Sequence, residues 1–206
     1  MWTAEFWDER YASSDKIWSG QPNRRLVEQT ADLVPGTALD VGAGEGADAI
    51  WLAQRGWSVT GIDLSQVALD RATTHAAAAG VSATFRQHDV LLDPVVGGFD
   101  LVTAHFMHVL RPAFDPLYVA LAAAVRPGGT LLVVGHHPHD VESGVRTHHG
   151  DDLLFDADRV TALLDPADWD VLVADAQSRP QVIDGEERTV TDTVVRAVRK
   201  VSAPAR

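Results

Sequence analysis

From about residue 36 onward, short apolar runs alternate with patterns typical of helices, and this alternation constrains the fold more than any other feature of the chain. Helices are expected between the runs: one ends near Gly56, one begins at Ser65 and ends at Gly80, and one spans roughly residues 112–125. A repeated order of strand, helix and strand predicts an α/β fold, a mostly parallel sheet with helices on both faces. The expected strands are residues 37–41, 57–63, 83–89, 99–104 and 130–135.

The two ends of the chain differ from this central region. After a helix expected near residues 156–164, residues 170–176 and 187–198 are separated by a turn that contains Asp184 and Gly185. This arrangement predicts an antiparallel hairpin. The residues before the first strand look helical and carry three of the six tryptophans, so they are expected to form a cap.

Length and charge limit the classes of partner. The 206 residues fit one domain, and a formal net charge of −12 disfavours nucleic acid and anionic membranes because like charges repel. Zero cysteines exclude disulfides and thiolate metal sites, and the N-terminus lacks the basic and apolar regions of a signal peptide. No stretch reaches the ~18 apolar residues of a membrane span. We expect a soluble, cytoplasmic protein, monomeric or homodimeric, that acts on a small molecule.

Three glycines, Gly42, Gly44 and Gly46, lie where the first strand turns into a helix. Glycine permits a tight turn there and lets a ligand approach the backbone, and ligands of open α/β sheets bind at the carboxyl ends of the strands. Asp63 ends the next strand, where a carboxylate can accept hydrogen bonds from both hydroxyls of a ribose. Asp89 ends the third strand and suits an amino group such as adenine N6. Together these residues predict a site for an adenosine-containing cofactor.

The glycine loop alone leaves two cofactors open, because it fits both G-x-G-x-G and the dinucleotide fingerprint G-x-G-x-x-A. A dinucleotide domain usually begins at its fingerprint strand, whereas a long segment precedes this one. Glu45, within the loop, is expected to repel a diphosphate. Both features favour S-adenosylmethionine, whose sulfonium is cationic. An NAD-dependent oxidoreductase and a non-catalytic S-adenosylmethionine-binding protein are the alternatives.

Five motifs follow one another in the central region: residues 38–46, 59–65, 87–90, 99–102 and 125–132. In these motifs the chain resembles the class I S-adenosylmethionine-dependent methyltransferases. The N-terminal pattern is similar to the small-molecule branch that includes tellurite-resistance-type and thiopurine-type enzymes; it consists of Trp7, Arg10, Tyr11, Trp18 and Asn23. The resemblance implies a Rossmann-like sheet of seven strands whose last strand is antiparallel. It implies one methyltransferase domain with a cap (1–35), a cofactor-binding core (36–135), and a substrate loop with the hairpin (136–206).

The resemblance also implies roles for residues at the carboxyl edge of the sheet. The methionine moiety is expected beside Asp40 and the three glycines, with Ala104 and His105 at its far end. The remaining implied contacts are Asp63 with the ribose, Leu64 with the adenine face, and Asp89 and Val90 with the adenine edge.

Methyl transfer from a sulfonium is an in-line displacement, so the enzyme mainly aligns a nucleophile and excludes water. A thiol or another soft anion arrives largely deprotonated, whereas a phenol benefits from a histidine base; an amine and a metalloid oxyanion are further candidate acceptors. His105 and His108 follow the fourth strand and are the candidate catalytic residues; His136 and His137 follow the fifth. Adjacent histidines chelate poorly and cysteine is absent, so no metal is expected.

Two segments are expected to close over the site. Trp7 and Tyr11 share one face if residues 3–13 are helical, and Tyr11 and Trp18 are expected to wall the sulfonium by cation–π contact. Residues 136–155 are too long for a simple connection and are the second candidate wall.

Overall fold

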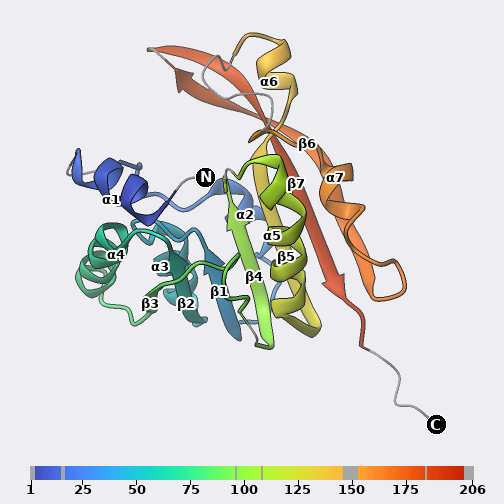
Figure 1. Ribbon diagram of the computed structural model, residues 1–206, viewed down its shortest axis with the longest axis horizontal. Coiled ribbons are helices and arrows are strands. Elements are labelled where there is room, and N and C mark those ends of the chain that lie inside the picture. The colour runs from blue at the N-terminus through green and yellow to red at the C-terminus, as the bar shows by residue number, and fades with distance from the viewer. Residues whose placement is uncertain are drawn as a thin grey trace.

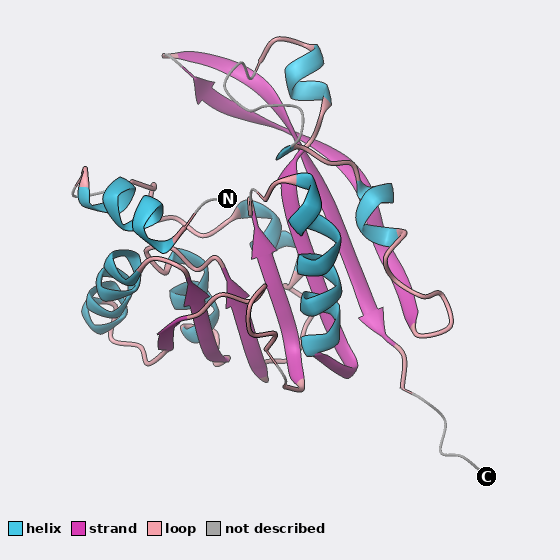
Figure 2. Ribbon diagram, viewed as in Figure 1, coloured by secondary structure: helices cyan, strands magenta, loops and turns pink. Residues whose placement is uncertain are grey.

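The computed structural model describes residues 3–14, 17–95, 97–107, 109–145, 153–183 and 185–201. One sheet of seven strands, in the order β3-β2-β1-β4-β5-β7-β6, lies between layers of helices (Figure 1, Figure 2). Strands β1 to β5 pair in parallel, and β7 is antiparallel to both β5 and β6. The predicted Rossmann-like fold is confirmed. The strands are β1 (Thr37–Val41), β2 (Ser58–Asp63), β3 (Thr84–Gln87), β4 (Phe99–His105), β5 (Val125–His136), β6 (Trp169–Ile183) and β7 (Glu186–Arg199).

The helices of the parallel region begin and end close to where the local sequence predicts, whereas the helix expected near residues 156–164 ends at Thr161. Ser65 caps α4 by accepting a hydrogen bond from the amide of Ala68 at 3.1 Å. Gly56 and Gly80 follow α3 and α4 with φ of 88° and 69°, a conformation that favours glycine. The helices are α1 (Ala4–Ala12), α2 (Arg24–Gln29), α3 (Ala47–Ala53), α4 (Gln66–Ala78), α5 (Arg111–Ala124), α6 (His139–Glu142) and α7 (Ala157–Thr161).

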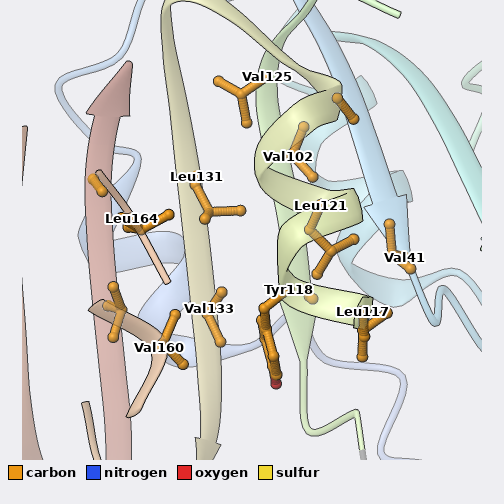
Figure 3. Packing of buried hydrophobic residues seen from close by; sticks show 14 of the residues in the cluster. Val41, Val102, Leu117, Tyr118, Leu121, Val125, Leu131, Val133, Val160 and Leu164 are labelled. Atoms are coloured by element: carbon orange, nitrogen blue, oxygen red, sulfur yellow. The ribbon is translucent and has the colours of Figure 1, made fainter. Parts of the chain in front are cut away.

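Strand β5 shows why the sheet is covered on both faces. Its apolar residues are consecutive, so alternate side chains point to opposite sides. Leu131 and Val133 pack with α5 and α7, as Figure 3 shows. Leu132 and Val134 pack on the other face, where Leu26 of α2 and Leu52 of α3 belong to the same cluster. A buried parallel strand of this kind requires two helical layers.

The predicted N-terminal cap contains two helices with different positions. Helix α1 lies against the start of α4, where Asp8 accepts hydrogen bonds from the Ser65 hydroxyl at 2.6 Å and the Val67 amide at 3.2 Å. Helix α2 packs on the sheet through Leu26, which is fully buried. In the described part of the cap, α1 and residues 17–23 lie over the carboxyl edge, and α2 reaches it at its first residue, Arg24.

The C-terminal hairpin is confirmed, but β6 is about twice as long as the sequence predicts. The expected strand ended at residue 176, whereas β6 continues through Pro180, which donates no backbone hydrogen bond. In the structure β6 is the outer strand of the sheet, and its free side tolerates that residue. Beyond the pair His136 and Asp192, where β5 ends, residues 178–183 and 186–191 continue past the sheet (Figure 1). We call these two segments the arm.

Within the described residues, none of the helices combines the length and the apolar character needed to cross a membrane.

Candidate active site

A cleft of about 2220 Å³ runs along the carboxyl edge of the parallel strands. Its walls come from the glycine loop after β1, the ends of β2, β4 and β5, helix α1 with residues 17–24, and the arm. The edge includes the point between β1 and β4 where the strand order reverses, which is where open α/β sheets bind ligands.

The Asp63 carboxylate is fixed at this point by backbone amides. One oxygen accepts the Gly44 N–H at 2.9 Å, and the other accepts the Ser65 N–H at 2.9 Å. Gly44 has a φ of 52°, so the loop can turn its amide toward the carboxylate. Burial raises the pKa of Asp63, and the surrounding N–H groups oppose that shift. Sequence analysis predicted this pairing of a glycine loop with Asp63.

Tyr11 and Trp18 lie over the glycine loop. The Trp18 indole N–H donates to the Tyr11 hydroxyl at 2.9 Å, and a Cβ on Gly44 would lie 2.9 Å from that hydroxyl oxygen. Tyr11 is buried, and the burial raises its pKa to about 12. Trp7 stacks beside Tyr11 with ring centroids 6.3 Å apart, as the spacing within the helix predicted.

The structure gives Glu45 a different role from the one that the sequence predicted. Its carboxylate is buried, pairs with Arg71 at 2.9 Å, and accepts the amides of Ile17 and Trp18 at 3.4 and 3.3 Å. Because Arg71 neutralises the carboxylate, the argument that Glu45 repels a diphosphate does not hold. Glu45 instead ties the segment after α1 to the glycine loop.

A buried cluster of Asp40, Asp48 and His105 lies between β1, α3 and β4. His105 Nδ1 is 2.7 Å from one Asp48 oxygen. The other Asp48 oxygen accepts a hydrogen bond from the backbone N–H of Asn23 at 2.6 Å. Asp40 accepts the Thr103 hydroxyl at 3.0 Å. Its Oδ2 and the Nε2 of His105 are buried and have no hydrogen-bond partner among the described residues. Burial, and then the nearby Asp48, raise the pKa of Asp40 to about 7. Burial alone would lower the pKa of His105, but the two carboxylates outweigh it and raise that pKa.

Comparisons with known proteins identify the core that carries this site. Residues 38–129 match the family described as a methyltransferase domain. A ubiquinone biosynthesis O-methyltransferase of Pseudomonas paraeruginosa (strain DSM 24068 / PA7) is 33% identical over 135 residues, which are 63% of this chain and 57% of that protein. Residues 38–129 of this chain are thus similar to a methyltransferase domain, and the chain spans little more than half the length of that relative. The family resemblance is thereby confirmed at the level of the class, and the core matches methyltransferases rather than the nicotinamide-dependent alternative.

Two solved structures extend the likeness of this methyltransferase domain over nearly the whole chain. A structure from work on the conversion of a disulfide bond into a thioacetal group during echinomycin biosynthesis has a TM-score of 0.78 at 25% identity. It covers 98% of this chain and 93% of its own. TehB from Haemophilus influenzae has a TM-score of 0.70 at 15% identity, and the superposition covers 96% of this chain and 67% of the TehB chain. The cap and the hairpin therefore belong to the shared fold.

The site of the methyltransferase domain fits S-adenosylmethionine. Asp40 Oδ2 is a buried acceptor that no other described residue pairs with, which suits a cationic group of the ligand. Gly42 and Gly44 keep the loop free of side chains: a Cβ on Gly42 would lie 3.1 Å from Met107. Leu64, Asp89 and Val90 line the same cleft, although one Asp89 oxygen also accepts the Leu91 amide at 2.9 Å as a turn residue.

Two predicted cofactor residues lie away from the cleft wall. Gly46 faces α4, where a Cβ would lie 2.8 Å from the Ala72 Cβ, so it serves packing between the loop and that helix. Ala104 is buried in the core cluster on the α5 face. Neither residue lines the cleft, and the geometry gives no support to a contact between these two residues and the cofactor.

The candidate histidines are placed unequally. His105 and His136 line the cleft, and the His136 ring lies 4.4 Å from the Phe106 ring, centroid to centroid. The His137 amide donates to the Thr191 carbonyl at 3.1 Å, and this histidine is not among the residues of the cleft wall. His108 lies outside the described residues. Phe106 has a φ of 52°, a strained conformation for this residue type at the end of β4.

Of the second predicted wall, residues 136–155, the described residues that reach the cleft are His136 and Leu153. Sequence reasoning missed Asp48 and Arg179, which line the cleft as well. Asp48 lies in the first turn of α3, and Arg179 lies in the part of β6 beyond the predicted strand. Neither has a local sequence signal, because their partners are distant in the chain.

Proposed function

We propose that the protein transfers the methyl group of S-adenosylmethionine to a small-molecule acceptor. The observation that carries the proposal is the Asp63 carboxylate, held by the Gly44 and Ser65 amides at the end of β2. A carboxylate in that position is suited to accept the hydroxyls of a ribose. The methyltransferase match of residues 38–129 supports the same assignment.

The cofactor-binding residues divide by the part of the ligand they suit. Asp40 and the loop of Gly42 and Gly44 suit the methionine moiety; Asp63 suits the ribose. Tyr11 and Trp18 lie over the loop, joined by the indole N–H of Trp18, and are suited to shield the methionine moiety from water. The remaining candidates, for the adenine, are Leu64, Asp89 and Val90.

When bound, S-adenosylmethionine supplies a methyl group on a sulfonium, whose leaving group is already activated. His105 is the candidate proton acceptor for an acceptor that must lose a proton. Asp48 fixes Nδ1 of His105 at 2.7 Å and thereby leaves Nε2 as the nitrogen free for that proton. Nε2 is buried in this structure, so proton transfer requires either that the adjacent cleft wall opens or that the methyl acceptor reaches Nε2 inside the wall.

An oxygen nucleophile is the first acceptor class to test. The curated relative is named an O-methyltransferase, and a hydroxyl is the acceptor for which a histidine base matters most. Thiols, amines and metalloid oxyanions remain further classes of acceptor. We place the reaction in the cytoplasm, without a nucleic-acid partner, in a monomer or homodimer; the net charge of −12 and the lack of cysteine support this setting.

The test is the release of S-adenosylhomocysteine from S-adenosylmethionine, measured with a panel of phenols, thiols, amines and metalloid oxyanions. Acceptor-dependent release supports the proposal. Tight binding of S-adenosylmethionine without release for any acceptor would favour the non-catalytic alternative.

A further inference from the structure

Charge is distributed unevenly along the cleft. Asp40, Asp48, Asp63 and Asp89 lie at the glycine-loop end, and within the described chain none of them pairs with an arginine or lysine. Of the other charged residues in the wall, Arg10 lies on α1 and Glu45 is paired with Arg71. At the end beside the arm, the wall contains Arg24, which is paired with Glu28, and Arg179 of the arm. The acidic end suits the cationic cofactor, and the basic end is left for the second ligand of the cleft.

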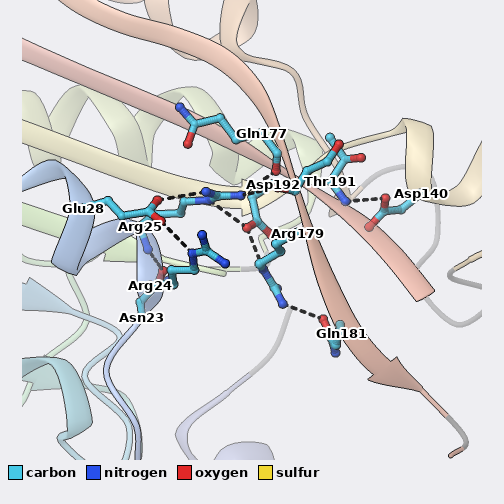
Figure 4. A network of polar contacts seen from close by, with 11 residues as sticks. Asn23, Arg24, Arg25, Glu28, Asp140, Gln177, Arg179, Gln181, Thr191 and Asp192 are labelled. Carbon is cyan, nitrogen blue, oxygen red and sulfur yellow. Dashed lines mark hydrogen bonds and ion pairs between the residues drawn. The ribbon is translucent and has the colours of Figure 1, made fainter. Parts of the chain in front are cut away.

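Arg179 is held in place by an unusual network (Figure 4). Its Nε donates to Asp192 Oδ2 at 2.7 Å, and its Nη1 donates to the side-chain oxygen of Gln181 at 3.0 Å. Asp192 is fully buried and its Oδ2 also accepts the Nε of Arg25, at 3.2 Å. One carboxylate oxygen therefore serves two arginines.

The network carries an excess positive charge. Arg24, Arg25 and Arg179 face the carboxylates of Glu28 and Asp192, three cations against two anions. Arg25 is buried, and its remaining donors are used by Glu28 and by the carbonyls of residues 177 and 178. Arg179 is one-fifth exposed, and its Nη2 forms no hydrogen bond within the described part of the chain. Arg24 and Arg179 both line the cleft, so these two residues present the excess charge there; Arg179 is the less exposed of the two, and Asp192 fixes its orientation.

The positions of the two ends indicate a long acceptor. His105 lies at the end of β4, and Arg179 lies on β6, three strands farther along the sheet. The register of β4, β5, β7 and β6 places Asp175 level with His105, and Arg179 lies four residues farther along β6. At about 4.8 Å per strand and ~3.4 Å per residue, the two backbones are on the order of 20 Å apart, and the Arg179 side chain reaches back toward the sheet to Asp192. The cleft, at about 2220 Å³, exceeds the ~1,000 Å³ that bounds a pocket for one drug-sized ligand. It has room for the cofactor and for a sizeable second molecule.

We propose that the acceptor is an elongated molecule with an anionic group, a carboxylate or a phosphate, that pairs with the Arg179 guanidinium while its nucleophile lies near the end of β4. This inference rests on the proposed methyl transfer. Arg179 then determines specificity: in a chain with a net charge of −12, it is the local cation that makes an anionic acceptor acceptable. A guanidinium whose Nε is already fixed by Asp192 is oriented in advance for such a partner.

The test uses two probes of the same length, 4′-hydroxybiphenyl-4-carboxylate and its neutral carboxamide. Each is titrated calorimetrically into the protein saturated with S-adenosylhomocysteine, so that the measurement does not depend on turnover. A hydrogen bond to a charged group makes the carboxylate bind about 10- to 100-fold tighter than the amide in the unaltered protein. Arg179→Gln removes this preference and leaves amide binding unchanged, while Arg179→Lys retains part of it.

Arg196→Gln is the matched control. Arg196 lies on the neighbouring strand β7, is similarly buried, and pairs with Asp32 at 3.0 Å, outside the cleft. This variant keeps the full preference for the carboxylate. Equal or absent binding of the two probes to the unaltered protein overturns the inference, and so does a preference that survives Arg179→Gln. Binding of S-adenosylhomocysteine is measured before either probe is added. If S-adenosylhomocysteine does not bind, that result contradicts the proposed function and, with it, this inference.

Discussion

Replacing Asp63 with alanine probes the cofactor site at the residue with the best-defined geometry. The substitution removes the acceptor of the Gly44 and Ser65 amides, both at 2.9 Å, and the oxygens proposed to accept the ribose hydroxyls. A hydrogen bond to a charged group contributes about 1.5–3 kcal/mol. We therefore expect the dissociation constant for S-adenosylhomocysteine to rise about 10- to 150-fold.

The free energy of unfolding should fall as well, because two amides lose their acceptor, so a control for stability is needed. Asp100→Ala provides it: Asp100 accepts the amide and the hydroxyl of Thr37, both at 2.7 Å, at the opposite edge of the sheet. Asp100→Ala should lose stability and keep cofactor affinity. Both variants are compared by calorimetry at a temperature where each is folded.

A cofactor analogue without ribose hydroxyls completes the cycle. It should bind the unaltered protein more weakly than S-adenosylhomocysteine does, but bind Asp63→Ala no more weakly than S-adenosylhomocysteine binds that variant. If folded Asp63→Ala binds S-adenosylhomocysteine with unchanged affinity, the ribose assignment is wrong.

Three further predictions concern the residues around the loop. Glu45→Gln removes the charged partner of Arg71 and weakens the acceptor of the Ile17 and Trp18 amides. These two amides should then exchange hydrogen at least about 10-fold faster, as measured by mass spectrometry. Unchanged exchange would show that Glu45 does not hold this segment. The pKa of Asp40 is about 7 in the folded protein, above its value in the unfolded chain. The free energy of unfolding should therefore fall as pH rises from about 4 to 7. Asp40→Asn should flatten that dependence, as measured by urea titrations. His105→Gln should lower turnover of a phenol about 100-fold at pH 7, with recovery at higher pH and little effect on a thiol; equal loss for both acceptors would remove His105 as a base.

The sequence predicts the core of the fold and half of the site, because those features depend on residues near one another in the chain. The turn from β1 into α3 and the cap at Ser65 are local, and both are found where they were expected. Asp63 is predictable as well, since the register of two adjacent parallel strands brings it beside Gly44.

The rest depends on contacts between distant segments. Glu45 was expected to face the ligand, but Arg71 and the segment after α1 hold its carboxylate. Arg179 owes its position to Asp192 and Arg25, and Arg25 lies more than 150 residues away in the sequence. Propensity and periodicity do not report such pairs. The extra length of β6 follows from its place at the edge of the sheet, which tolerates Pro180.

The central claim is methyl transfer at the carboxyl edge of this sheet, and formation of S-adenosylhomocysteine together with a methylated acceptor tests it most directly. Mass spectrometry of a reaction with S-adenosylmethionine carrying a deuterated methyl group should detect the label on an acceptor from the panel, in equal amount to S-adenosylhomocysteine. Asp63→Ala should reduce both products together at limiting cofactor. Binding of S-adenosylmethionine with no labelled acceptor in any class, carboxylate-bearing phenols included, would contradict the account.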